Sequence, residues 1–261
     1  MKQQKDNEIP KAEIDSFNKE EETKMYEKKK YTYEHNNSTD YYSQINNERD
    51  PYVSCFNTSM INVGLNIMKL EPPTEKAKTG GYKQPEDQFD YFMHTDKEVV
   101  SFTEEYKAKN AWAKDYDPRE LWEVEVFAFN KWIGRKVCRV CYNMKRRDFY
   151  DEIQNGRGVV TTGKFCGYRH AVSVVGFKAE IADRLYKDVK ISGDNISILV
   201  GDNDITEIII DDSYGNPNAN YKPVGVGGND VHMPREKLFE CIDKSGNKLD
   251  EKYYGILFDL A

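Results

Sequence analysis

The order in which two hydrophobic patterns occur limits the fold of this chain most. Apolar residues recur at helical spacing from Met60 to Leu70 and again, more weakly, over 84–114. Runs rich in Val and Ile follow after residue 135, separated by Gly and Asp: RGVVTTGKF, RHAVSVVGFKAEI, NISILVGD and TEIIIDDS. Helices followed by strands are typical of an α+β protein with an antiparallel sheet, whereas parallel sheets need alternating strands and helices. The sequence therefore predicts the α+β class.

Several residues predict where the helices begin and end. Pro72-Pro73 should stop the first helix, and 74–81 then reads as a loop. In DPRELWEVEVFAFNKWIG, Asp117 is a suitable N-cap and Pro118 suits the first helical position. Gly134 should end that helix. The segments RKVCRVCYN and KRRDFYDEIQNG then predict a short strand and a further helix.

The first thirty residues differ in composition from the rest. They carry eight Lys and eight Asp or Glu among few apolar residues, which is too little apolar surface for a core. We therefore predict a charged N-terminal arm over 1–38, which could dock the protein on a larger assembly. The domain itself is expected to span 39–261, with a helical, insertion-like region over 71–140.

Composition excludes several classes of partner and location. The net charge of −7 and the isoelectric point near 5.3 argue against a nucleic-acid-binding protein, which needs a clustered basic surface. No apolar run approaches the ~20 residues of a membrane span, and no signal-peptide core is visible. We expect a protein that is cytoplasmic when made and that leaves the cell, if at all, by release or within a particle.

The cysteines and glycines give no sign of a cofactor. Five cysteines with no regular spacing do not form a disulfide framework, so at least one thiol should be free. Cys138 and Cys141 form a CxxC pair, but a structural zinc site needs four ligands and no second pair is present. No Gly-rich phosphate loop follows a predicted strand. The sequence predicts neither a metal nor a cofactor.

A possible nucleophile lies where the first helix should start. Cys55 stands between the turn-like stretch YSQINNERDP and the apolar helix pattern. A helix N-terminus or a protonated His nearby lowers the pKa of a thiol from ~8.5 into the range ~3.5 to 7.5. A free Cys is also a common buried core residue, so the position alone leaves both interpretations open.

Three further residues could act with this thiol. His170 opens an apolar strand, and an imidazole beside a thiol can serve as its base. Asp211 and Asp212 end the run TEIIIDDS, and strand alternation turns only one of them towards the His, where a carboxylate would orient the imidazole. Gln44, eleven residues before Cys55, offers an amide donor for an oxyanion.

These segments resemble a known family. The motifs are YSQINN, DPYVSCFNTSMINVGLNIM, DEIQNGRGVVTTGKFCGYRHAVSVVGF and EIIIDDSYGNP. In order and context they are similar to the papain-like cysteine peptidases of the bacteriocin-processing-peptidase-like (double-glycine peptidase-like) group. The resemblance covers roughly 41–216, apart from an unmatched 71–140. It implies a helical subdomain and an antiparallel β-sheet subdomain, with the active-site cleft between them.

The resemblance also implies a role for each residue. Cys55 matches the nucleophile, His170 the base and later acid, Gln44 the oxyanion donor and Asp212 the orienting acid. The family usually has Pro where this chain has Ser213, so Asp211 and Asn216 stay as alternatives for the acid. Tyr168-Arg169 precede His170 where a small residue is common, and this pair could narrow the cleft or favour an acidic substrate group.

The expected function is therefore hydrolysis of an amide bond by a Cys-His-Asp triad through a thioester. A peptide, a protein or peptidoglycan could be the substrate. The alternative is a catalytically silent papain-like structural or adaptor protein of a larger assembly such as a phage particle. A scaffold would have no physical need for all four residue types in this order.

Overall fold

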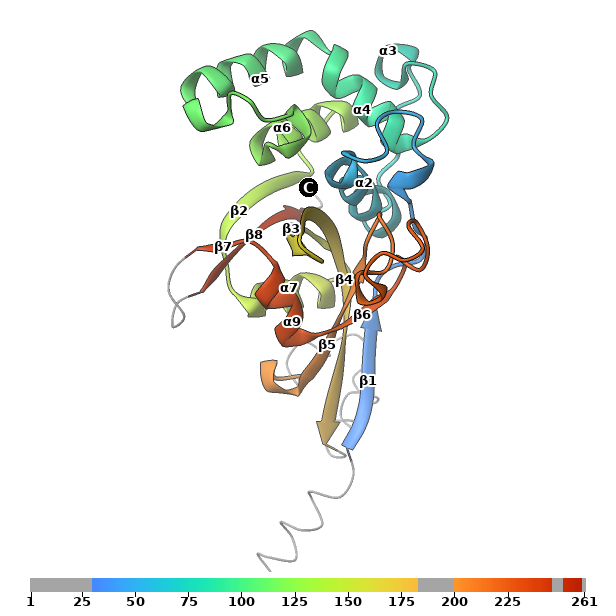
Figure 1. The fold of residues 1–261 in the computed structure, drawn as a ribbon, viewed down its shortest axis with the longest axis vertical. Helices are drawn as coiled ribbons and strands as arrows, with labels where there is room; N and C mark the ends of the chain where they lie inside the picture. The colour runs from blue at the N-terminus through green and yellow to red at the C-terminus, as the bar shows by residue number, and fades with distance from the viewer. Residues whose placement is uncertain (1–29, 183–199, 246–250, 260–261) are drawn as a thin grey trace, which may run out of the picture.

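The computed structural model describes residues 30–182, 200–245 and 251–259. Within these residues the chain forms one antiparallel sheet with helices on both faces (Figure 1). The strands are β1 (Lys30–Asn36), β2 (Cys138–Met144), β3 (Val159–Phe165), β4 (Tyr168–Ala182), β5 (Ile205–Asp211), β6 (Val231–Pro234), β7 (Lys244–Ser245) and β8 (Lys252–Phe258). The predicted α+β class with an antiparallel sheet is confirmed.

The sheet is built around the long strand β4. Its strand order is β2-β8-β3-β4-β5-β6, with β1 pairing β4 and β7 pairing β8. The first half of β4 pairs with β3 and the second half with β1, while β5 runs along the other edge. The register places Ser173 opposite Asp211. Because the strands are antiparallel, the chain that leaves β5 after Asp211 heads towards His170.

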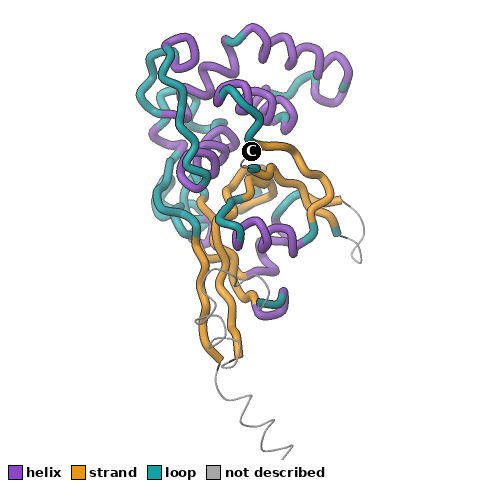
Figure 2. Tube along the Cα trace, turned by 180° about the vertical axis from the view of Figure 1, so that it is seen from behind, coloured by secondary structure: helices purple, strands orange, loops and turns teal. Residues whose placement is uncertain are grey.

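Most helices gather at one end of the molecule. They are α2 (Cys55–Ile61), α3 (Lys76–Thr79), α4 (Pro85–Thr95), α5 (Lys97–Lys109), α6 (Trp122–Ile133), α7 (Arg146–Gln154) and α9 (Arg235–Cys241). A π-helical segment, Asn62–Ile67, continues α2. Figures 1 and 2 show α3 to α6 grouped beyond one end of the sheet, with α2 between that group and β4. Helices α7 and α9 lie along the strands.

Alternation along the strands separates the two large clusters of the core, which lie on opposite faces of the sheet. Val160, Ala171 and Val175 face the cluster formed with α2, α4 and α6. Val172 and Val174 face the opposite cluster, formed with α7 and α9. Side chains of successive strand residues point to opposite faces, so both faces of β4 are apolar and both are covered. The strand that carries His170 is therefore buried on both faces over most of its first half.

Several predicted boundaries are confirmed and others are corrected. Helices fill most of 84–114, and Gly134 ends α6 at a φ of 88°. The predicted loop 74–81 contains the short helix α3. Asp117 caps a 3-10 turn, Pro118–Glu120, instead of α6, because Leu121 is extended and interrupts the helix. The predicted strand NISILVGD lies mostly outside the described residues.

The predicted arm over 1–38 ends too late in the chain. Residues 30–36 form β1, which pairs with β4 over seven residues, from Lys30 with Ala182 to Asn36 with Gly176. Alternating Tyr and polar residues in KYTYEHN have the period of a strand, and Tyr31 and Tyr33 pack against the core. The domain therefore begins at or before residue 30. Residues 1–29 lie outside the described part.

The helical region predicted over 71–140 belongs to the main core. Phe89 and Phe92 of α4 and Phe129 and Trp132 of α6 pack in the same cluster as α2. Phe129 also meets Phe258 of β8 at a centroid distance of 5.7 Å. These contacts tie the region to both α2 and the sheet. None of the described helices is long and apolar enough to cross a membrane.

A buried ion network joins α4 to the turn before α6. The side chain of Arg119 is 7% exposed and pairs with Asp117 at 2.7 Å, Asp50 at 3.1 Å and Asp90 at 3.3 Å. Asp90 also accepts from Arg49. Removing one partner of a buried pair leaves an uncompensated charge, which costs far more than losing an exposed pair.

We therefore expect Arg119→Met to lower the free energy of unfolding by about 3 kcal/mol. The matched control is Arg139→Met, because Arg139 pairs with Asp259 on the surface, where the side chains are 48% and 55% exposed. That change should cost less than about 1 kcal/mol. Urea unfolding followed by circular dichroism measures both. Equal losses for the two variants would show that the Arg119 network is not stabilising.

Candidate active site

Cys55 is the first residue of α2, as the sequence predicts. Phe56 and Met60 bury the helix in the core, and the Ser173 hydroxyl of β4 donates to the Ser59 carbonyl at 3.2 Å. The first N–H groups of a helix have no intrahelical acceptor and carry a partial positive charge. The half-buried thiol therefore lies at an electropositive helix end that is anchored to the sheet.

His170 and Asp212 form a buried pair beside this thiol. His170 Nε2 lies 2.6 Å from Asp212 Oδ1, and the two residues are 7% and 0% exposed. Because Nε2 faces the carboxylate, Nδ1 is the ring nitrogen left for the thiol. The ring contacts Phe165, Tyr214 and Tyr221 at centroid distances of 6.4, 6.1 and 6.0 Å. These aromatic neighbours limit both water access and ring rotation.

Asp212 is held by main-chain and side-chain donors. Its Oδ1 accepts from the Tyr214 N–H at 3.0 Å, and its Oδ2 accepts from the Tyr221 hydroxyl at 2.9 Å. Its own N–H donates to the Gly228 carbonyl at 2.8 Å. A Cβ at Gly228 would lie 2.0 Å from the Asp212 carbonyl oxygen, so only glycine fits there. The loop after β5 thus fixes the position of the Asp212 carboxylate.

Asp211 points to the other side of the strand. Its carboxylate accepts from the Ser38 hydroxyl at 2.7 Å and from the Asp230 N–H at 3.0 Å. The third candidate, Asn216, caps the turn Pro217–Ala219 by accepting from the Asn218 N–H. Of the three alternatives left open by the sequence, Asp212 is the one whose carboxylate reaches His170.

The electrostatics favour a thiolate and an imidazolium. Burial raises the pKa of the Cys55 thiol, but the charge of His170 and hydrogen bonds from His170 and the Ala171 backbone outweigh it, so the pKa falls below its ordinary value of 9.0. Burial lowers the pKa of His170, yet Asp212 and Cys55 raise it well above its ordinary value of 6.5. Opposite shifts of this kind are typical of an activated nucleophile and its base.

Gln44 and Cys55 line the same cavity. Its side chain is buried, Oε1 accepts from the Ser213 hydroxyl at 2.7 Å, and Nε2 donates to the Pro51 carbonyl at 2.7 Å. The amide nitrogen carries a second N–H beyond the one given to Pro51. These contacts fix the amide plane, and the second N–H is the donor that an oxyanion could use.

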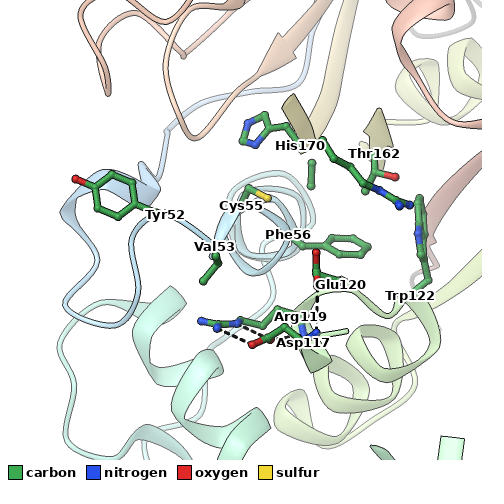
Figure 3. Close-up of a pocket in the computed structure, with 12 residues that line it drawn as sticks. Tyr52, Val53, Cys55, Phe56, Asp117, Arg119, Glu120, Trp122, Thr162 and His170 are labelled. Carbon is green, nitrogen blue, oxygen red and sulfur yellow. Dashed lines mark hydrogen bonds and ion pairs between the residues drawn. The ribbon is translucent and has the colours of Figure 1, made fainter. Parts of the chain in front are cut away.

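Two cavities meet at Cys55 and His170. The smaller, about 200 Å³, has Val53, Phe56 and Trp122 among its walls, with Asp117 and Arg119 at one side (Figure 3). In Figure 3 Cys55 lies between His170 on one side and Asp117 and Arg119 on the other, and Trp122 lies beside Thr162. The larger, about 520 Å³, lies on the Gln44 side. The thiol is therefore open to a cleft lined by both the helical group and the sheet.

Sequence reasoning missed several residues of this site. Tyr214 and Tyr221 were not selected, although both lie in the aromatic stretch that follows the predicted acid. Arg119 and Trp122 were treated only as part of a helix start. A Tyr cluster shortly after a candidate acid was the one available signal. Among the described residues, no group of three or more His, Cys, Asp or Glu is placed to hold a metal ion.

Comparison of the chain with models of known protein families, with curated proteins and with solved structures finds no match.

Proposed function

We propose that the protein is a cysteine peptidase or amidase with a papain-like arrangement of its active site. The observation that carries the proposal is that Cys55, His170 and Asp212 lie next to one another beside a cleft. The thiol has a lowered pKa, the histidine has a raised pKa, and the buried carboxylate lies 2.6 Å from the imidazole. A nucleophile, its base and an orienting acid are the groups that acyl transfer requires.

The proposed reaction has two halves. The Cys55 thiolate attacks the amide carbonyl, while the Cys55 N–H and the Gln44 amide stabilise the oxyanion. His170 protonates the departing amine, which leaves a thioester on Cys55. The neutral imidazole then removes a proton from water, which attacks the thioester and releases the acid. Asp212 keeps the ring oriented and stabilises its charged form throughout.

Two features support a peptide or peptidoglycan substrate over a small metabolite. The cavities extend from the thiol in two directions, which suits a chain that continues past both sides of the scissile bond. Their walls are open and combine apolar side chains with polar groups. The helical group and the sheet each supply one wall, and this division supports the papain-like arrangement.

The test is incubation with a peptide library and with purified peptidoglycan, followed by mass spectrometry of the products. New amine and acid ends define the scissile bond. Absence of cleavage, together with a Cys55 no more reactive to iodoacetamide than the exposed Cys166, would reject the proposal. In that case a non-catalytic scaffold or adaptor role would be the better explanation.

Tyr221→Phe tests how far the loop after β5 supports the triad. Loss of the hydroxyl removes a charge-assisted hydrogen bond from Asp212, of a kind that contributes about 1.5 to 3 kcal/mol. We expect kcat for a cleaved peptide to fall about tenfold with little change in KM, because the imidazole is held less firmly. Tyr33→Phe is the control, since that hydroxyl contacts His35 in β1. A Tyr221→Phe enzyme with unchanged kcat would contradict this role.

A further inference from the structure

The larger cavity differs in charge from the smaller one. Besides the Cys55–His170 pair, whose opposite charges offset each other, two cationic side chains, Arg169 and Lys222, are among its lining residues, and no Asp or Glu is. The smaller cavity is lined by Asp117 and Glu120 as well as by Arg119 and Arg169, so its charges balance. The larger cavity is therefore positive in a protein whose net charge is −7.

Both cations of this cavity are available to a ligand. The Arg169 side chain is 62% exposed, and its ion pair with Asp243 is long, at 3.4 Å. The same Asp243 oxygen already accepts from the Thr162 hydroxyl at 2.5 Å. Lys222 is exposed and makes no ion pair with any residue in the described ranges. Neither positive charge is neutralised by a close, well-formed pair with another described residue.

Tyrosines complete the walls of this cavity. Tyr52, in the turn before α2, and Tyr168, the first residue of β4, are 73% and 72% exposed, and both line the cavity. Tyr214 and Tyr221 pack edge to face at a centroid distance of 5.2 Å beside His170. Rings of this kind give apolar contact area at low entropic cost, while their hydroxyls stay available for hydrogen bonds.

We propose that this cavity is a subsite for a carboxylate of the substrate, bound between Arg169 and Lys222. The inference rests on the proposed function, because the carboxylate belongs to the chain that is cleaved at Cys55. An acidic side chain near the scissile bond and a free chain-terminal carboxylate present the same chemistry. Guanidinium and ammonium donors make charge-assisted hydrogen bonds to either one.

The expected preference is moderate. Each exposed ion pair contributes little by itself, so the two cations together should favour a carboxylate over a carboxamide about tenfold. Screening by salt should reduce the preference at high ionic strength, since both cations face solvent.

The test uses covalent probes, so that it does not depend on hydrolysis. Three chloroacetyl dipeptides alkylate Cys55: chloroacetyl-Gly-Gln amide, chloroacetyl-Gly-Glu amide, and chloroacetyl-Gly-Gln with a free terminal carboxylate. The thiolate displaces chloride and forms a thioether, which mass spectrometry of the Cys55 peptide quantifies. The second probe represents an acidic side chain and the third a chain terminus.

We expect at least one carboxylate probe to label Cys55 about tenfold faster than the neutral probe. In the double variant Arg169→Gln, Lys222→Gln this rate ratio should fall to near one, whereas Lys97→Gln on the distant helix α5 should leave it unchanged. A variant that changes the reactivity of the Cys55 thiol changes the labelling rates of all probes equally, so the ratio of the rates is unaffected.

Equal rates for all three probes, or a ratio that survives the double variant, would overturn the subsite. If the protein shows the expected rate ratios but cleaves no peptide or peptidoglycan, the carboxylate subsite is supported and the proposed hydrolase activity is rejected. The two proposals can therefore fail separately.

Discussion

Cys55→Ala is expected to reduce hydrolysis of any cleaved peptide by about four to six orders of magnitude, because the proposed reaction forms its thioester on the Cys55 sulfur. The fold should survive, since the change removes a single half-buried sulfur and costs roughly 1 kcal/mol. Product formation followed by chromatography measures the first effect, and urea unfolding measures the second.

Cys166→Ser is the matched control for this substitution. Cys166 lies four residues before His170 in the exposed turn between β3 and β4, and its thiol donates to the Pro217 carbonyl. A serine can keep that contact, so activity should stay near the wild-type level. If Cys55→Ala retains hydrolysis, or if both variants lose it equally, the assignment of Cys55 as the nucleophile is rejected.

His170→Ala is expected to have a comparable effect on hydrolysis and a second effect on the thiol itself. The imidazolium charge is what offsets the burial of Cys55, so its loss should raise the pKa of the thiol. Alkylation of Cys55 by iodoacetamide should then require a higher pH than in the wild type. The rate of alkylation against pH, read from the Cys55 peptide, measures this shift.

The Cys55–His170 pair also sets how the rate of hydrolysis by the wild-type protein should change with pH. Hydrolysis should rise as the thiol loses its proton, below the ordinary pKa of 9.0, and fall as His170 loses its proton, above the ordinary 6.5. For the alkylation experiment with His170→Ala, the control variant is His232→Ala. His232 pairs with Glu207 on β5 and does not line either cavity. An alkylation profile that does not move in His170→Ala would mean that the imidazole does not activate the thiol.

The helices and strands were predictable because their signals are local. The apolar spacing after Cys55 and the Val- and Ile-rich runs around His170 indicate burial of one face or both, and neither needs knowledge of distant residues. The boundary placed at residue 38 missed β1 because this strand is polar on one side and follows directly on the charged segment. What makes it a strand is pairing with β4, 140 to 152 residues further along the chain.

The candidate site was predictable in its residue types and only partly in its contacts. Alternation already implied that one of Asp211 and Asp212 faces His170, but choosing between them needed the register of β5 against β4 and the loop that closes on Asp212. The Gln44 amide was chosen for its position before Cys55. Its contacts with Pro51 and Ser213 became visible only in three dimensions.

By itself, the sequence determined the α+β class, the start of α2 at Cys55 and the residue types suited to acyl transfer, because helix starts and strand periods are encoded by near neighbours. The tertiary structure decided which acid meets the imidazole, what encloses the ring and which charges line the cleft. These depend on strand register and loop closure, which are set by packing between segments far apart in the chain. The cavity lined by Arg169 and Lys222 is of this second kind, since the two residues are 53 positions apart in the chain and line one cavity only in the folded protein.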